Sequence, residues 1–298
     1  MGTPEFAVPS LQILVENGFN VVGVITAPDK PKGRGQKLAT SPVKDYAVSQ
    51  NIPVLQPTNL KNPEFIEELR SYKANLQIVV AFRMLPEVVW DMPEIGTFNL
   101  HGSLLPQYRG AAPINWAIMN GEKKTGVTTF FLKHEIDTGN IIFQEEEPIE
   151  EDDTVGDLYV RLMEKGAQLV LKTVQAVQTG VYPQLPQNEV QEIKHAPKIF
   201  KETCEIDWSK SSQEVYDFIR GLSPYPAAWT EINDTQFKIF KTEKLDMVKA
   251  GEQPGDYSTD NKTYLHIQTG GQALAITELQ MQGKKRMKIE DFLRGNNL

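Results

Sequence analysis

The chain of 298 residues has little of three things: cysteine, long apolar runs and excess positive charge. Its single cysteine, Cys204, excludes an internal disulfide and a site built from several thiolates, which favours a reducing compartment. The apolar run at 78–82 is far shorter than the roughly 18 residues that a membrane-spanning helix needs, so no membrane partner is expected. A net charge of -8 disfavours nonspecific coating of nucleic acid, although it leaves room for a local basic site.

The first residues lack a basic segment followed by a long apolar one, which argues against a signal peptide and predicts a cytoplasmic protein. The composition, 40% hydrophobic and 23% charged, is typical of a globular chain long enough for about two domains. The sequence does not give the oligomeric state, and we expect a monomer. No metal is expected, because no spacing typical of a ligand set connects the four scattered histidines, His101, His134, His195 and His266.

Residues 1–181 alternate short apolar runs with helical patterns, as expected of βαβ units around a parallel sheet. Strands are predicted at 20–26, 52–55, 76–82, 97–101 and 126–132, and helices at 8–15, 42–49, 63–72, 111–119 and 154–179. The pattern predicts a Rossmann-like, doubly wound domain with a mostly parallel sheet.

The first strand of that sheet is missing from the pattern. A doubly wound sheet normally opens with a buried strand before its first loop, but this chain starts in the loop at Gly2-Thr3-Pro4. We expect the polypeptide to begin a few residues upstream, with Met1 as an internal methionine.

The composition changes after Val181, where prolines and polar residues indicate a linker over 182–199. Residues 200–298 contain a predicted helix at 213–221 and short strands at 236–240, 264–268 and 273–279, which predict a small OB-like β-barrel, although the pattern alone does not separate barrel from sandwich. The acidic stretch 145–153, in which seven of nine residues are Asp or Glu, is predicted to be an exposed, solvated connector.

Polar residues suited to acyl transfer follow the strand predicted at 97–101. Asn99 and His101 are two residues apart, so their side chains share one face at the sheet edge that borders the usual ligand crevice, and Asp137 follows the next strand. Asn and protonated His can donate hydrogen bonds to an oxyanion, and Asp can hold an imidazolium. Taken alone, such a trio is more often structural, because polar side chains at turns usually bond backbone groups.

The segment from Asn99 and His101 to Pro106, with Asp137-Thr138-Gly139, resembles the signature of the folate-dependent formyltransferases. Further segments extend this similarity over nearly the whole chain, at 2–9, 29–35, 41–44, 109–113 and 220–229. They are most similar to the members of the family that act on initiator methionyl-tRNA.

The resemblance implies an enzyme that transfers the formyl group of 10-formyltetrahydrofolate to the α-amine of methionine on initiator methionyl-tRNA, for translation initiation. Asn99 and His101 would stabilise the oxyanion, and Asp137 would orient His101 and assist proton movement. Arg83 stands where the family commonly has the second residue of a Tyr-Gly pair, and its role is left open. The resemblance places the folate site against Phe82, Met84, Leu85, Ser103, Leu104, Leu105 and Pro106.

Two basic clusters stand out from the acidic background. The loop 30–37 contains four cations within eight residues, and composition alone describes it as a flexible, solvated loop. The resemblance implies that this loop enters the major groove of the tRNA acceptor stem, where Arg34 helps to select the initiator and Lys32 and Lys37 contact phosphates. It also implies that C-terminal cations orient the tRNA, namely Lys284, Lys285 and Arg286, on one face with Lys238, Lys241 and Lys244.

Two other functions remain open at this point. A formyltetrahydrofolate hydrolase or a sugar-nucleotide formyltransferase would share Asn99, His101 and Asp137 but should lack the basic Gly-Arg-Gly loop that this chain contains at 33–35. A catalytically idle RNA-binding protein on the same scaffold would not need the three intact polar residues.

Overall fold

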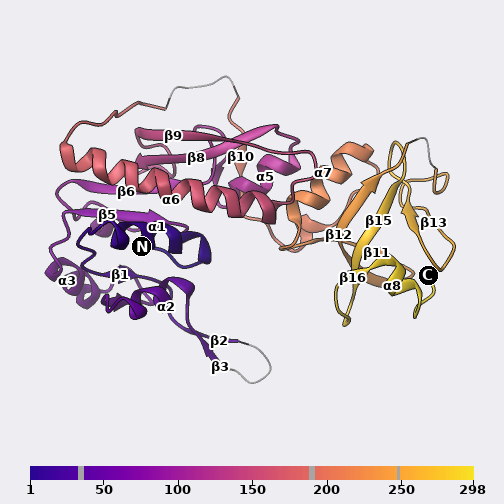
Figure 1. Cartoon of the computed structure of the whole chain (residues 1–298), viewed down its shortest axis with the longest axis horizontal. Coiled ribbons are helices and arrows are strands. Elements are labelled where there is room, and N and C mark those ends of the chain that lie inside the picture. Colours follow the sequence, from indigo (N-terminus) through magenta and orange to yellow (C-terminus); the bar gives the residue numbers. More distant parts are fainter. Residues whose placement is uncertain (33–36, 188–191, 247–248) are drawn as a thin grey trace. The chain divides into compact units, whose positions relative to one another are not determined.

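A computed structural model of the chain describes residues 1–32, 37–187, 192–246 and 249–298. The chain divides into two compact units (Figure 1). Each unit is built from three separate stretches, so the chain passes between them several times. The first unit contains Met1–Arg109, Gly126–Glu147 and Tyr159–Lys194, and the second contains Gly110–Thr125, Pro148–Leu158 and His195–Leu298.

The first unit is built on a mixed sheet in two pieces. In one piece β1 (Val24–Ile25) pairs in parallel with β4 (Val54–Leu55). The other piece has the order β5-β6-β8-β9, with β5 parallel and β8 antiparallel to β6. The predicted Rossmann-like α/β class is confirmed. The strands of this larger piece are β5 (Leu76–Val80), β6 (Gly96–His101), β8 (Lys124–Phe131) and β9 (Ile141–Pro148).

Helices of the first unit begin where the sequence supplies caps. At α2 the Ser41 hydroxyl accepts a hydrogen bond from the Lys44 backbone N–H, and Pro42 is the first helical residue. Asn62 and Pro63 do the same for α3. The elements are η1 (Glu5–Ala7), α1 (Val8–Glu16), α2 (Pro42–Ser49), α3 (Pro63–Ser71), α4 (Glu87–Trp90) and most of α6 (Val155–Thr179), with short strands β2 (Lys30–Lys32), β3 (Lys37–Ala39) and β7 (Arg109–Gly110).

A cavity of about 540 Å³ is lined by residues of both β1 and β5. Its other lining residues include Leu14 of α1 and Val177 of α6. Met1 and Gly2 bridge the two strands: Gly2 N–H donates to the Ile25 carbonyl, and Val80 N–H donates to the Met1 carbonyl.

The second unit is a curled antiparallel sheet packed against a helix, which agrees with the predicted small barrel (Figure 1). Its strand order is β11-β12-β15-β14-β13, and β16 pairs with β15. Trp208 is buried in the core of this unit, and Trp229 packs partly buried against it. The elements are α5 (Pro113–Met119), β10 (His195–Ala196), η2 (Glu202–Cys204), α7 (Ser212–Leu222), β11 (Ala228–Ile232), β12 (Thr235–Lys244), β13 (Tyr257–Thr259), β14 (Leu265–Ile267), β15 (Leu274–Met281), β16 (Met287–Lys288) and α8 (Ile289–Leu293).

The acidic stretch 145–153 is only in part the exposed connector that its composition predicts: Glu150, Glu151 and Asp152 are exposed and lie outside any strand or helix. Its first part belongs to β9, where the buried Glu147 pairs with Arg161 at 2.7 Å and Lys165 at 3.1 Å. Burial alone would raise the pKa of Glu147, but the two cations outweigh it and lower this pKa. Asp153, at the far end, is also buried. Ion pairing therefore allows an acidic sequence to form the strand at the edge of this sheet.

A buried ion pair fixes α7 of the second unit. The Arg220 guanidinium bonds Asp217 at 2.7 Å and donates to the backbone carbonyls of Glu150 and Asp153 at 3.2 and 2.9 Å. Both charged side chains are about 95% buried. Removing one partner therefore leaves an uncompensated charge in the core.

Arg220→Met should accordingly lower the free energy of unfolding by about 3–5 kcal/mol, measured by urea denaturation of the full chain. Arg294→Met is the matched control, because Arg294 forms an exposed pair with Asp291 and such pairs contribute about 1 kcal/mol or less. Equal losses for the two variants would contradict a stabilising role for the buried pair.

Candidate active site

Strand β6 carries two of the three predicted catalytic residues. Asn99 pairs in register with Val79 of β5 and Phe130 of β8, and His101 pairs with Thr128 of β8. Because β6 is bonded on both sides, its backbone is fixed, and the alternation of side chains along a strand places Asn99 and His101 on one face.

The His101 ring is buried, and its Nε2 lies 2.9 Å from the Tyr108 carbonyl oxygen. A carbonyl can only accept a hydrogen bond, so Nε2 carries the hydrogen. The edge of the Phe130 ring packs against the imidazole with centroids 6.5 Å apart. These contacts leave Nδ1 as the ring nitrogen available for other partners.

Asp137 faces that second nitrogen. Its Oδ2 lies 3.9 Å from His101 Nδ1, and the two side chains are only 11% and 7% exposed. This distance is within ion-pair range but longer than a direct hydrogen bond. The structure thus brings the predicted imidazole and carboxylate together in a sheltered position, although they are 36 residues apart in the sequence.

Asn99 contributes a polar atom without a partner. Its Oδ1 is buried and has no hydrogen-bond partner among the residues that the structure describes. Because nearly all buried polar atoms in proteins are hydrogen-bonded, such an atom calls for an explanation. A carboxamide held ready for the polar atoms of a substrate provides one, whichever way the amide is turned.

The segment 103–106 is shaped by hydrogen bonds from neighbouring strands. Ser103 and Leu105 are buried, whereas Leu104 and Pro106 are only partly covered. The Ser103 hydroxyl donates to the Gln107 carbonyl at 2.6 Å, so this side chain shapes the loop. The bond between Leu105 and Pro106 is cis.

Two residues that the sequence pattern did not single out support this segment. The Thr128 hydroxyl donates to the Ser103 carbonyl at 2.6 Å and accepts from Leu105 N–H at 3.2 Å. Gln144 of β9 donates to the Leu105 carbonyl and to Thr128 Oγ1, both at 2.9 Å. Nothing in an apolar strand pattern indicates that one threonine holds a loop 23 residues earlier.

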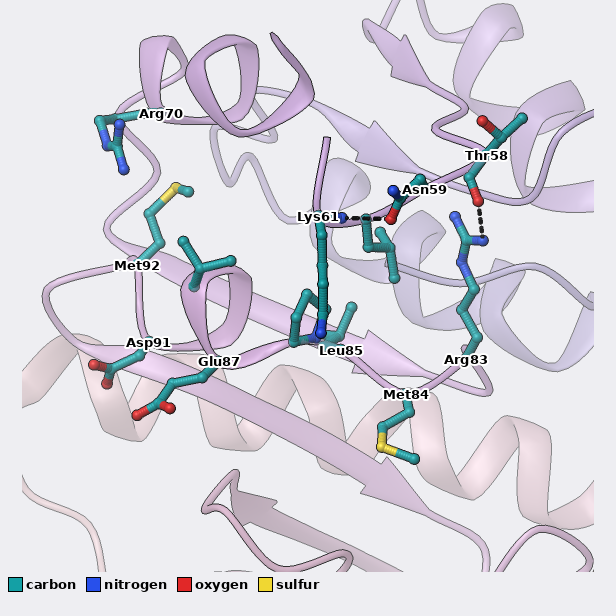
Figure 2. A pocket seen from close by; sticks show the side chains of 13 residues that line it. Thr58, Asn59, Lys61, Arg70, Arg83, Met84, Leu85, Glu87, Asp91 and Met92 are labelled. Carbon is teal, nitrogen blue, oxygen red and sulfur yellow. Dashed lines mark hydrogen bonds between the residues drawn. The ribbon is translucent and has the colours of Figure 1, made fainter. Parts of the chain in front are cut away.

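An open groove of about 1170 Å³ lies beside the other predicted folate segment, residues 82–85 (Figure 2). Met84 is 75% exposed and Leu85 is buried, and both line it, together with Lys61 and Arg83. Phe82, two residues after the end of β5, is partly buried. Among the described residues that line the groove, none is Asn99, His101 or Asp137. The structure therefore places the predicted folate segment 82–85 at a groove whose described lining residues do not include the three predicted catalytic residues.

Arg83 has a structural role that the sequence left open. Its guanidinium donates to the carbonyls of Pro57 and Thr58, the latter at 3.0 Å (Figure 2). It also lies against the Phe82 ring, 5.7 Å from the centroid. Arg83 thus ties the loop after β5 to the loop after β4 and fixes one wall of the groove.

The predicted tRNA-contacting loop is anchored at its base. Lys44 Nζ lies 2.6 Å from Asp29 Oδ2, and Gln56 bonds the other oxygen at 2.8 Å. The hydrogen bond from Lys44 lowers the pKa of Asp29. Arg34 lies outside the described residues. Lys32 is the last residue of β2, and Lys37 is the first residue of β3.

The C-terminal cations differ in how they are engaged. Lys284 and Lys285 are exposed, but Arg286 pairs with Glu278 and lies over the Phe240 ring at 4.4 Å. Two further cations of the predicted basic face also have partners: Lys244 pairs with Glu151 at 2.5 Å, and Lys238 donates to the Pro226 carbonyl at 3.4 Å.

Comparison with known proteins gives a consistent result over both units. The family model described as "Formyl transferase" matches residues 1–174, and "Formyl transferase, C-terminal domain" matches residues 198–297. The chain belongs to the formyl transferase family. Among the described residues, no group of three or more His, Cys, Asp or Glu side chains forms a metal site, and no helix there is long and apolar enough to cross a membrane.

Two relatives and one solved structure show how similar this chain is to individual members of the family. The methionyl-tRNA formyltransferase of Bacteroides fragilis is 56% identical over 306 residues, covering 100% of this chain and 94% of the relative. That of Phocaeicola vulgatus is 58% identical, covering 99% and 94%. A solved structure of WlaRD, a sugar 3N-formyl transferase in the presence of dTDP and 5-N-formyl-THF, is 25% identical with a TM-score of 0.68, covering 95% of this chain and 97% of that one.

Thr128→Val tests the support of the 103–106 segment. It should lower the free energy of unfolding by about 1–3 kcal/mol for each backbone or amide group left without a partner, and weaken folate binding. Thr125→Val on the same strand is the control, because the buried Thr125 hydroxyl has no partner in the described part of the chain and its loss should be neutral or stabilising. Urea denaturation and folate titration would measure both, and indistinguishable variants would refute the assignment.

Proposed function

We propose that this chain transfers the formyl group of 10-formyltetrahydrofolate to the α-amine of methionine on initiator methionyl-tRNA. The observation that carries the proposal is the sheltered His101–Asp137 pair, with Asn99 on the same face of β6 as His101 and its buried Oδ1 without a partner among the described residues. The similarity to methionyl-tRNA formyltransferases over the whole chain supports this choice of acceptor.

In the proposed reaction the amine nitrogen bonds to the formyl carbon, and the carbonyl oxygen becomes an oxyanion. The bond from that carbon to the folate nitrogen then breaks. One proton leaves the amine, and one reaches the departing nitrogen. The enzyme therefore needs a donor for the oxyanion and a group that handles the proton.

The three residues supply these functions. Asn99 serves the oxyanion through the NH₂ group of its carboxamide, and its unpartnered Oδ1, which can only accept, suits an N–H of the attacking amine. His101 is held through Nε2 by Tyr108, so Nδ1 is the edge that serves the reaction, with Asp137 beside it. The neutral imidazole accepts the amine proton at Nδ1, and the carboxylate beside it stabilises the imidazolium that forms.

The remaining parts of the chain bind the two substrates. We assign the folate to the segments 82–85 and 103–106, and the tRNA to the Arg34 loop and the exposed cations Lys284 and Lys285. Arg286 contributes less to phosphate binding, because it is already paired with Glu278. We retain the division into a catalytic domain at 1–181, a linker at 182–199 and a tRNA-binding domain at 200–298, in a monomer that acts in the cytoplasm.

Single-turnover transfer of labelled formyl tests the proposal. The protein is offered 10-formyltetrahydrofolate with either initiator or elongator methionyl-tRNA, and labelled methionine is quantified. Formylation of the initiator alone is the expected result. Transfer to an amino-sugar nucleotide but to neither tRNA would overturn the choice of acceptor, and release of free formate would indicate a hydrolase.

Asp137→Asn completes this experiment. Loss of general acid–base assistance should slow transfer by about 10²–10⁴-fold, while binding of initiator tRNA is retained. Asp234→Asn, in an exposed turn with the same left-handed backbone, is the control. If the Asp137 variant transferred formyl at the parental rate, the catalytic assignment would be wrong.

A further inference from the structure

The backbone of the turn that carries Asp137 has an unusual conformation and lies very close to a neighbouring strand. Asp137 has φ of +55°, in the left-handed region where residues other than glycine are uncommon. Two residues later, Gly139 lies so close to β8 that a Cβ there would be 1.5 Å from the Phe131 carbonyl oxygen. A turn of this kind keeps its shape only where neighbouring groups hold it.

A distant segment of the chain lies along this turn. Leu185 and Ile141 exchange two backbone hydrogen bonds, at 2.8 and 2.9 Å, in an antiparallel bridge. Because the two segments are antiparallel, the residue two positions after Leu185, which is Gln187, lies opposite the residue two positions before Ile141, which is Gly139. This segment belongs to the stretch that its proline-rich composition predicted to be only a linker.

The Gln187 side chain bonds the turn directly. Its Nε2 donates to the carbonyls of Asp137 and Gly139, at 2.7 and 2.9 Å. Its Oε1 accepts from Arg109, at 3.1 Å from Nε and 2.6 Å from Nη2. Because a guanidinium only donates and carbonyls only accept, the carboxamide has one satisfactory orientation between them.

We infer that Gln187, oriented by Arg109, is a positioning residue that holds the Asp137 carboxylate beside His101. The inference rests on the proposed function, since it concerns the residue assigned there to proton handling. The hydrogen bonds of Gln187 go to the backbone of the turn and to Arg109, not to the imidazole. Its effect is therefore on the geometry of the His101–Asp137 pair.

Gln187→Glu is the sharpest variant. Glutamate is nearly isosteric and keeps an acceptor for Arg109, but an ionised carboxylate cannot donate to the two carbonyls and repels them. A misplacement of about 1 Å at a reacting group can cost about 10²-fold in rate, so kcat should fall by up to that factor. KM for initiator tRNA and for the formyl donor should not change.

Gln187→Ala and Gln184→Ala provide the comparison. The first removes the same two donated bonds without adding a charge and should give a similar fall in kcat. The second changes an exposed glutamine of the same segment, whose side chain forms no hydrogen bond with the described residues, and should behave as the parent. Thermal unfolding of each variant separates loss of fold from loss of positioning.

A double-mutant cycle decides whether Gln187 acts through Asp137. If it does, Gln187→Ala should cost nothing further in an Asp137→Asn background, because the side chain that it positions has already been changed. Additive losses in the double variant, or parental kcat in the folded Gln187 variants, would overturn the inference. Absence of formyl transfer in the unmodified protein would instead overturn the proposed function, so the two failures are distinguishable.

Discussion

The hydrogen bond from His101 Nε2 to the Tyr108 carbonyl is the interaction on which the site depends. It fixes which ring nitrogen carries a hydrogen and turns the opposite nitrogen toward Asp137. The burial of both side chains excludes most of the solvent that would screen their interaction. The orientation of one imidazole thus links the loop after β6 to the turn after β8.

The sheet supplies the rigidity that this geometry requires. β6 is bonded to β5 and β8 along the residues that carry Asn99 and His101, so the two side chains have a fixed spacing. The loops that approach them are held by side chains: Thr128 and Gln144 support the segment 103–106, and Gln187 bonds the Asp137 turn. Loops have no regular hydrogen-bond ladder to fix them. In this site, polar side chains of neighbouring segments hold the loops in place instead.

Local signals in the sequence were enough to predict many elements. The N-cap at Ser41 and Pro42 marks the start of α2, and the spacing of Asn99 and His101 on one strand follows from its period of two. β9 escaped prediction because Glu147 is paired with Arg161 and Lys165 of α6, which only the folded chain brings near. The hydrogen bonds of Gln187 and Arg83 could not be predicted either, because each side chain donates to backbone carbonyls of a segment far away in the sequence.

The most direct test of this account is ¹⁵N NMR of histidine-labelled protein, with His101 assigned by its loss in His101→Gln. The structure predicts that His101 carries a hydrogen on Nε2 and that Asp137→Asn shifts the Nδ1 resonance, since this nitrogen faces the carboxylate. A ring protonated only on Nδ1, with resonances that do not respond to Asp137→Asn, would contradict the arrangement from which the mechanism is derived.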